Sequence, residues 1–210
     1  MANHVYFYID MSTDAEQSEL VQKLSETCKE TNGEHGWHSW NIEQLPIYDT
    51  PYDEEGWYNW GCENLGAKWV SCEDWNENII CGHSAWSPVT PFINNLVQYI
   101  HRESGKPISA KMTYEDEFRN FIGVHHCEVD EKGTFMEDYE EFEGEDLNQL
   151  MLEAFGKDDD WFNSDDFDWW TMFPITKEGH PLQGQKWEPQ EYCDEVVYNF
   201  FSTERLEHIS

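Results

Sequence analysis

Acidic side chains dominate this sequence, and their excess limits what the chain can fold into. There are 44 Asp and Glu residues against 12 Lys and Arg, so the formal net charge is -32 over 210 residues. A chain with this much charge stays disordered unless it also has enough apolar surface to form a core. Because 11 Trp, 10 Tyr and 12 Phe supply large side chains of that kind, we predict a folded protein with a strongly anionic surface.

The same charge excludes several classes of partner. Nucleic-acid backbones and anionic membranes are bound through clustered Lys and Arg, and the sequence shows no such cluster. No apolar run approaches the roughly 18 residues of a membrane span, and the first residues do not follow a signal-peptide pattern. We therefore expect no direct binding of nucleic acid or membrane. We expect the protein to work in the cytoplasm of a host cell, with its six Cys reduced.

The first part of the chain alternates strand and helix patterns. Residues 5–9 (VYFYI) predict a buried strand, and Thr13 and Glu16 have the spacing of a capping box at the start of a helix. Asn32-Gly33 marks the end of that helix. Residues 34–66 are rich in Gly, Pro, Trp and Tyr with little periodicity, and we interpret them as a Trp-rich insertion. Within it we expect a strand or an extended arm before Pro46, formed by Trp37, Trp40, Ile42 and Leu45.

A hairpin, a second helix and two further strands are predicted after the insertion. The helix begins at Thr90, taken as the N-cap, and ends at Gly105. The last of the strands is expected to be broken or bulged near Gly123. The predicted strands are 68–75, 78–84, 108–114 and 118–129. This order favours the α+β class, with an antiparallel or mixed sheet of ferredoxin-like type and two helices on one face.

We divide the chain near residue 135. Residues 1–135 form the expected ferredoxin-like domain, and residues 136–210 form an acidic, aromatic-rich extension packed on it. Between Glu137 and Asp168 there are 14 acidic residues and one basic residue. One or two helices are expected in the extension, at 146–155 and 191–206, where apolar residues recur at helical spacing.

Four segments carry a resemblance to a known family. They are MANHV at the start, NIEQLPIYD at 41–49, GWYNWGCENLGAKW at 56–69 and SAWSPVTPFINNL at 84–96. In order and spacing they resemble the YubB-type ferredoxin-like domain family of phage and plasmid proteins, over residues 1 to about 133. The sequence departs from that pattern at Leu65 and Ala67. The resemblance implies a ferredoxin-like fold and an origin on a phage or plasmid, and it implies little about activity.

The aromatic residues of the insertion and its surroundings have two interpretations. They could form a platform on which a sugar or a base stacks, or they could be the core of a small sheet. A stacking platform for single-stranded nucleic acid also needs a basic groove, and Lys68 is the one basic residue among them. We favour the core. The residues are Trp57, Tyr58, Trp60, Trp69 and Trp86.

Two pairs of metal-binding residue types occur on predicted strands. Cys81 with His83, and His125 with Cys127, are two residues apart and share a strand face, so the pairs could converge if their strands were neighbours. Structural zinc sites show tighter ligand spacing. We expect these side chains to be packed thiols and imidazoles, with no metal and no cofactor.

Enzyme motifs are missing from the sequence. There is no nucleophile elbow, no phosphate-binding glycine loop and no zinc-protease helix motif. The aspartates 158–160 and those at 165, 166 and 168 lack the glycine and glutamate of a calcium loop. A pair of carboxyl groups could hydrolyse glycosides, but 44 acids do not single out two. We expect no catalytic residues.

The density of carboxylates suggests a basic partner. Duplex DNA carries one phosphate per roughly 1.7 Å of its axis, and a folded array of carboxylates can imitate it. Our leading hypothesis is an acidic, non-enzymatic phage or plasmid protein that binds and inhibits a basic, DNA-binding host protein, as an anti-defence protein acting as a DNA mimic. The expected contact residues are Glu137, Asp138, Glu140, Glu141, Glu143, Glu145, Asp158, Asp159, Asp160, Trp161, Asp165, Asp166, Asp168 and Trp169.

Two alternatives remain open at this point. The protein could be a structural or accessory assembly module of a mobile element, whose charge serves solubility. It could instead be a carboxylate-based hydrolase with a Trp-lined cleft. The oligomeric state, monomer or dimer, is open as well.

Overall fold

The computed structural model describes residues 3–32, 37–117 and 120–146. The chain divides into two compact units, Met1–Glu141 and Phe142–Ser210. The first unit holds almost all of the described residues, and the fold below is that of this unit. The helices expected at 146–155 and 191–206 lie outside the described residues, apart from Asp146.

An eight-stranded antiparallel sheet and four helices make up the described part, which confirms the α+β class. The strands are β1 (His4–Ser12), β2 (Lys29–Asn32), β3 (Trp37–Trp40), β4 (Val70–Asn76), β5 (Ile79–Ala85), β6 (Ile108–Asp116), β7 (Phe121–Val129) and β8 (Phe135–Glu143). They lie in the order β2-β3-β4-β5-β1-β6-β7-β8. The helices are α1 (Ala15–Cys28), the short 3-10 helix η1 (Ile42–Gln44), α2 (Trp57–Asn64) and α3 (Thr90–Ser104).

Alternating burial along β1 separates the two faces of the sheet. Val5, Phe7, Ile9 and Met11 are buried, and the residues between them are exposed or half-buried. Neighbouring strands continue this pattern, because Phe7 lies opposite Gly82 of β5 and opposite Tyr114 of β6. Successive side chains of a strand point to opposite faces, so one face of the sheet is apolar along its whole centre.

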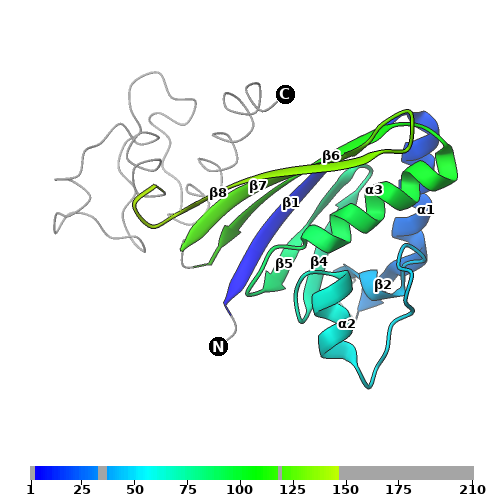
Figure 1. Cartoon of the computed structure of the whole chain (residues 1–210). Coiled ribbons are helices and arrows are strands. Elements are labelled where there is room, and N and C mark those ends of the chain that lie inside the picture. Colours follow the sequence, from blue (N-terminus) through cyan, green and yellow to red (C-terminus); the bar gives the residue numbers. More distant parts are fainter. Residues whose placement is uncertain (1–2, 33–36, 118–119, 147–210) are drawn as a thin grey trace, which may run out of the picture. The chain divides into compact units, whose positions relative to one another are not determined.

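The helices cover this apolar face (Figure 1). The inward side of α3 contributes Phe92, Ile93, Leu96, Val97 and Ile100, each with 0% exposure. Apolar residues at this spacing form one stripe of a helix, and α3 packs with it against β6 and β7. The remaining helical contributions to the core are Val21, Leu24 and Cys28 of α1, Ile42 of η1 and Trp60 of α2.

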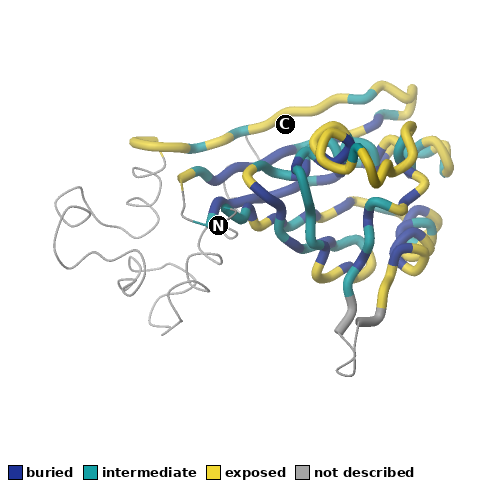
Figure 2. Tube along the Cα trace, turned by 90° about the horizontal axis from the view of Figure 1, so that it is seen from below, coloured by how far each residue is buried: buried dark blue, intermediate teal, exposed yellow. Residues whose placement is uncertain are grey.

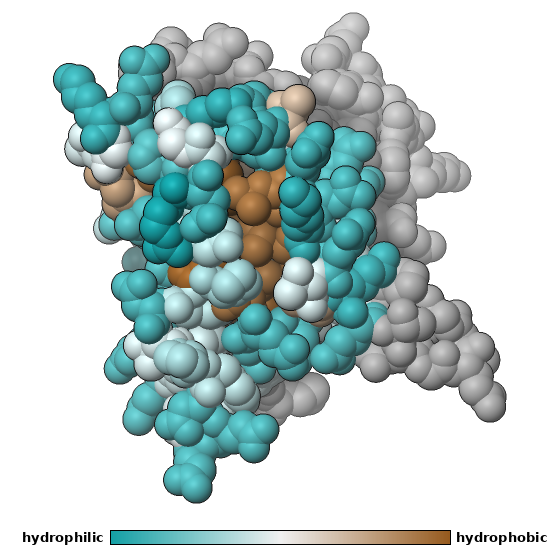
Figure 3. Space-filling view, turned by 90° about the vertical axis from the view of Figure 1, so that its right-hand side faces the viewer, coloured by the Kyte–Doolittle hydropathy of each residue, from teal (hydrophilic) through white to brown (hydrophobic). Residues whose placement is uncertain are grey.

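Burial therefore concentrates in the sheet and on the inner sides of the helices, as Figure 2 shows along the chain. In the view of Figure 3 hydrophobic residues come to the surface in one central patch, and hydrophilic residues surround it. No helix among the described residues is long and apolar enough to cross a membrane.

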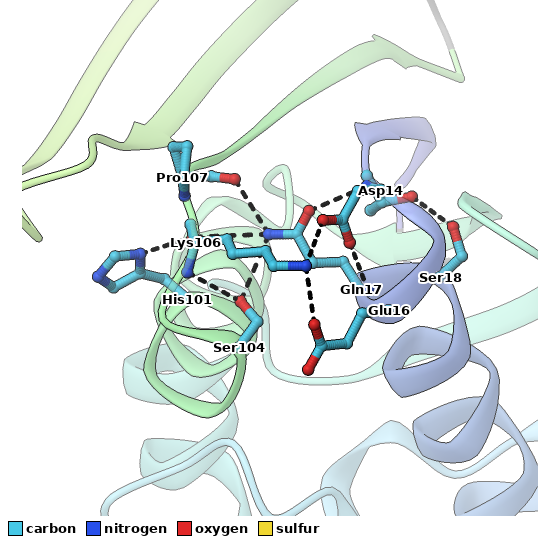
Figure 4. A network of polar contacts seen from close by, with 9 residues as sticks. Asp14, Glu16, Gln17, Ser18, His101, Ser104, Lys106 and Pro107 are labelled. Carbon is cyan, nitrogen blue, oxygen red and sulfur yellow. Dashed lines mark hydrogen bonds and ion pairs between the residues drawn. The ribbon is translucent and has the colours of Figure 1, made fainter.

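The start of α1 is fixed by a polar network (Figure 4). Asp14 is the N-cap: its side chain accepts from the backbone N–H of Gln17 at 2.9 Å, and the Gln17 side chain accepts from the backbone N–H of Asp14 at 3.0 Å. The Nζ of Lys106 lies 2.6 Å from Asp14 and 2.7 Å from Glu16. These contacts lower the pKa of Asp14, with the hydrogen bond from Lys106 as the largest cause.

The capping box predicted at Thr13 and Glu16 was therefore wrong by one residue. Asp14 has the extended backbone of an N-cap (φ -85°, ψ 177°), and its carboxylate accepts from the backbone N–H of Gln17. Glu16 instead pairs with Lys106. The second helix shows a similar shift, since Val89 rather than Thr90 is its N-cap.

Other boundaries also differ from the prediction. The first helix ends at Cys28, because the next four residues pair with β3 as strand β2. The Trp-rich insertion contains β3, η1 and α2: the strand at its start was expected, and the helix Trp57–Asn64 was not. Strand β7 runs without a break through Gly123, which stays in register opposite Tyr114. The two strands of the hairpin, β4 and β5, are confirmed within two residues at each end.

Strand β8 was not predicted, because five of its nine residues are acidic and none is buried. The strand begins at Phe135, next to the boundary we placed at residue 135, and continues to Glu143. Strands are usually recognised by buried alternate residues, and no residue of β8 is buried.

We predict that Gly82→Ala destabilises the protein by about 2–3 kcal/mol, as overpacking of a core does. A Cβ at Gly82 would lie 2.9 Å from Cζ of Phe7 and 3.1 Å from Cα of Cys72, and it would clash with the carbonyl of Ser71. Urea unfolding, monitored by circular dichroism, would measure this loss of stability.

The control for this variant is Gly105→Ala. Gly105 ends α3 with a positive φ of 67°, but a Cβ there meets nothing within 4 Å. Gly105→Ala should therefore lower the free energy of unfolding by only about 1 kcal/mol, because alanine disfavours the left-handed backbone conformation. Equal stability of the Gly82→Ala variant and the parent protein would contradict the close approach of β4 and β5.

Candidate functional site

Strand β8 carries five of the carboxylates that we expected to bind a partner. They are Glu137, Asp138, Glu140, Glu141 and Glu143. β8 is the last strand in the sheet order, next to β7. Charged side chains on such an edge strand discourage unwanted pairing with other strands. The acids thus lie together on one edge of the sheet (Figure 1).

Glu137 is held by a chain of hydrogen bonds from the interior. Asn94 of α3 donates through Nδ2 to Oε2 of Glu137 at 2.6 Å. The amide oxygen of Asn94 lies 2.9 Å from Nε2 of His125, so the neutral ring carries its proton on Nε2 and donates it. His125 is 3% exposed and its Nε2 lies 3.7 Å from Glu137. One acid of β8 is therefore fixed to both α3 and β7.

Glu141 is held in a similar way, by a tyrosine. The hydroxyl of Tyr114, on β6, donates to Oε2 of Glu141 at 2.9 Å. Tyr114 is 4% exposed, and its ring lies over Gly123 of β7, where a side chain would clash with it. Burial and this hydrogen bond raise the pKa of Tyr114, so the hydroxyl remains a donor at neutral pH.

The two anchors act on alternate residues of one strand. Glu137 and Glu141 are four positions apart, so their side chains leave the same face of β8. Both are exposed overall, yet each has a defined partner in the folded unit. Two of the five carboxylates of β8 are therefore positioned by side chains of the core elements.

The other expected contact residues fall into two groups. Asp138 is exposed and Glu140 is half-buried; Glu143 and Glu145, in the second unit, are exposed. The remaining residues lie outside the described residues: Asp158, Asp159, Asp160, Trp161, Asp165, Asp166, Asp168 and Trp169.

The two Cys/His pairs do not converge on a metal site. Cys81 and His83 are on β5, His125 and Cys127 are on β7, and β1 and β6 lie between these strands. Three strand spacings correspond to about 14 Å. The register also places the pairs on opposite faces, since His125 lies opposite buried Met112 while His83 lies opposite Tyr6. Within the described ranges, no group of three His, Cys, Asp or Glu side chains could hold a metal ion.

The thiols have the properties of packed side chains. Burial raises the pKa of Cys28 to about 12, of Cys81 to about 11 and of Cys127 to about 12. The nucleophilic and metal-binding form of cysteine is the thiolate. These three cysteines therefore remain protonated at neutral pH.

The aromatic residues of the insertion do not form one platform. Trp60 is 5% exposed and donates from Nε1 to the carbonyl of Thr50 at 2.9 Å, as expected for a core residue. Trp57, Tyr58 and Trp86 are instead 44%, 54% and 55% exposed. The interpretation as core thus holds for Trp60 and fails for these three.

A second cluster of rings was missed in the sequence. It consists of His4 and Tyr6 on β1, His83 on β5, and Trp69, which precedes β4. The ring centroids of His4 and His83 are 4.7 Å apart, and Trp69 stands nearly perpendicular to both, at 5.5 Å and 5.7 Å. We call these four residues the ring cluster. It lies on the sheet face opposite the three helices, because Tyr6 and His83 alternate with the buried residues of their strands.

Carboxylates border the ring cluster. Oε1 of Glu73 lies 2.9 Å from Nδ1 of His83, and Oε2 of Glu117 lies 3.8 Å from Nδ1 of His4. The Glu73 contact has the length of a hydrogen bond but not its angle, so we treat it as an ion-pair contact. The only sequence signal for this cluster was the alternation of His4 and Tyr6 along a strand, which any half-exposed strand shows.

Comparison of the chain with protein-family models, with curated proteins and with solved structures finds no match. The resemblance to the YubB-type family therefore stays a prediction.

We predict that Asn94→Ala loosens β8. The variant removes the donor to Glu137 and leaves His125 without its acceptor. We expect this to lower the free energy of unfolding by about 1–3 kcal/mol. Amide hydrogen exchange, read by mass spectrometry, should become faster in peptides covering residues 135–141. Gln98→Ala is the control, because Gln98 is exposed on the same helix and its side chain bonds only the backbone of that helix. Unchanged exchange in β8 would show that the Asn94 anchor does not hold the strand.

We predict a contribution of His125 to the pH dependence of stability. Burial lowers its pKa below the ordinary 6.5; His126 lowers it further, and Glu137 and Asp138 oppose the shift. The unfolded chain therefore takes up a proton more readily than the folded one. Stability is unaffected well above pH 6.5, falls as the pH drops through 6.5, and levels off below the folded pKa.

Thermal unfolding of the parent and of His125→Gln between pH 8 and pH 5.5 would measure this contribution. The parent should lose more stability than the variant over that range, by up to about 1.4 kcal/mol, because pH 5.5 lies one unit below the ordinary pKa of 6.5. Parallel curves for the two proteins would overturn the prediction. Carboxylates affect both proteins alike, so they cancel in the comparison.

Proposed function

We propose that this protein is a non-enzymatic, acidic protein of a phage or plasmid that binds and inhibits a basic, DNA-binding protein in the cytoplasm of its host. The observation that carries the proposal is the uncompensated negative charge of a folded unit. Residues 1–141 contain 27 acidic and 8 basic residues. Such a surface attracts basic proteins at long range and speeds their association.

The basic residues of the unit do little to offset this charge. Lys106 already pairs with Asp14 and Glu16. Three more cations stack on aromatic rings of the same unit: Lys29 over Trp40, Lys68 over Trp86 and Arg102 over Tyr99, at 5.2, 5.6 and 5.0 Å. The 8 basic residues therefore leave most of the 27 acidic residues of the unit without a balancing charge.

The spacing of charges on β8 supports mimicry of DNA in particular. Five carboxylates lie between Glu137 and Glu143. At about 3.3 Å per residue, these six steps span about 20 Å. One strand of duplex DNA has about six phosphates over the same distance. The anchors from Asn94 and Tyr114 hold two of the five in place, so a partner need not order them on binding.

We also propose that the centre of the sheet is a ferredoxin-like domain. The elements β1, α1, β4, β5, α3 and β6 follow one another as β-α-β-β-α-β, and their strands lie in the antiparallel order β4-β5-β1-β6. This arrangement supports the resemblance to the YubB-type family, and with it an origin on a phage or plasmid. Strands β2 and β3 on one side, and β7 and β8 on the other, extend the sheet.

A carboxylate hydrolase is the second candidate, for one observation. A groove of about 250 Å³ is lined by Glu30, Trp40 and Glu43, among others, and burial raises the pKa of Glu43. A carboxyl group of that kind can serve as a general acid. Ligand pockets usually measure about 300–1,000 Å³, so the groove is small for a sugar chain. The binding function therefore has the stronger support.

Affinity capture tests the proposed function. We predict that the immobilised full chain retains basic, DNA-binding proteins from a bacterial lysate, identified by mass spectrometry. Their binding should weaken steeply between about 50 and 200 mM salt, as phosphate contacts do. An excess of duplex DNA should displace them, and the eluted partner should lose its DNA binding when the protein is added back.

The outcomes separate the alternatives. A partner that stays bound at high salt and is not displaced by duplex DNA would overturn mimicry. Sedimentation as a defined oligomer or particle, without any basic partner, would instead support an assembly module.

A further inference from the structure

We propose that the ring cluster, with Glu73 and Glu117, is a binding site for an arginine side chain of the basic partner. This inference rests on the proposed function, and it names the chemical group that the protein recognises. The site lies on the face of the sheet opposite the three helices, apart from the anchors of β8.

The geometry of the rings suits a planar cation. Trp69 stands at 79° to His4 and 87° to His83, so an indole forms one wall beside two imidazoles. Tyr6 closes the cluster at 6.1 Å from His83. Cations bind over aromatic faces within about 6 Å of the ring centre, with Trp the strongest partner.

The carboxylates supply hydrogen-bond acceptors beside these rings. Glu73 is 58% exposed at its side chain and Glu117 is 32% exposed, so both reach solvent as well as the cluster. His4 fixes Glu117 by donating its backbone N–H to Oε2 at 3.1 Å. A guanidinium can stack on an indole and donate several hydrogen bonds to carboxylates at the same time.

The same chemistry selects against other ligands. Two carboxylates repel a phosphate or a carboxylate ligand. A lysine ammonium is more strongly hydrated and has no flat face to stack, so it gains less from the indole. Lys68, the residue before Trp69, stacks over Trp86 rather than in the cluster. The site is therefore matched in charge and shape to arginine.

The experiment titrates the full chain with two short peptides, acetyl-tetra-arginine amide and acetyl-tetra-lysine amide. Binding is followed by calorimetry and by the NMR signals of the His4, His83 and Trp69 rings. We expect the arginine peptide to shift these signals and to bind about tenfold more tightly than the lysine peptide.

Two variants and two matched controls locate the site. Trp69→Leu and Glu73→Gln should each weaken arginine binding about tenfold. Trp86→Leu removes an exposed Trp outside the cluster, and Glu54→Gln makes the same charge change as Glu73→Gln at an exposed position. Both controls should bind within about twofold of the parent.

The outcomes distinguish this inference from the proposed function. Equal weakening in Glu73→Gln and Glu54→Gln, or shifts confined to other residues, would overturn the arginine site even if lysate capture succeeds. Specific arginine binding without any captured protein would keep the site and overturn the proposed partner. Because Glu73 is more than half exposed, its variant should fold even if Trp69→Leu does not.

Discussion

The packing of helices on one face of a single sheet is the constraint on which this structure depends. Five side chains of α3 have no exposed surface, and they meet the buried residues of β6 and β7. Burying five such side chains contributes about 10 kcal/mol before the entropy of ordering is counted. That contribution is what allows a unit with 27 acidic and 8 basic residues to remain folded, since the carboxylates repel one another at its surface.

The same core determines where functional groups stand. Asn94 and His125 belong to elements of the core, and through them the interior fixes Glu137 at the edge of the sheet. Tyr114 does the same for Glu141. The opposite face of the sheet does not have to pack against helices. It therefore presents imidazoles and an indole beside carboxylates. Surfaces of different chemistry thus lie on one sheet, charged at the edge and aromatic on the face.

Much of the fold follows from local patterns. The strand at 5–9, the hairpin of β4 and β5, and helix α3 were predicted because their apolar residues recur with the period of the element. Strand β8 was not, because it buries no side chain and is held by long-range pairing and two hydrogen bonds. Cap positions were displaced by one residue, since the N-cap is set by where the backbone leaves the helical conformation: this is Asp14 for α1 and the apolar Val89 for α3.

The sequence by itself determined the class of the fold and the acidic character of the chain. These depend on composition and on short periodic patterns. The tertiary structure decided which residues meet. It separated Cys81 and His83 from His125 and Cys127 by two strands, and it brought His4, Trp69 and His83 within 6 Å of one another. Such contacts depend on strand order and register, which join residues far apart in the chain and leave no local pattern behind.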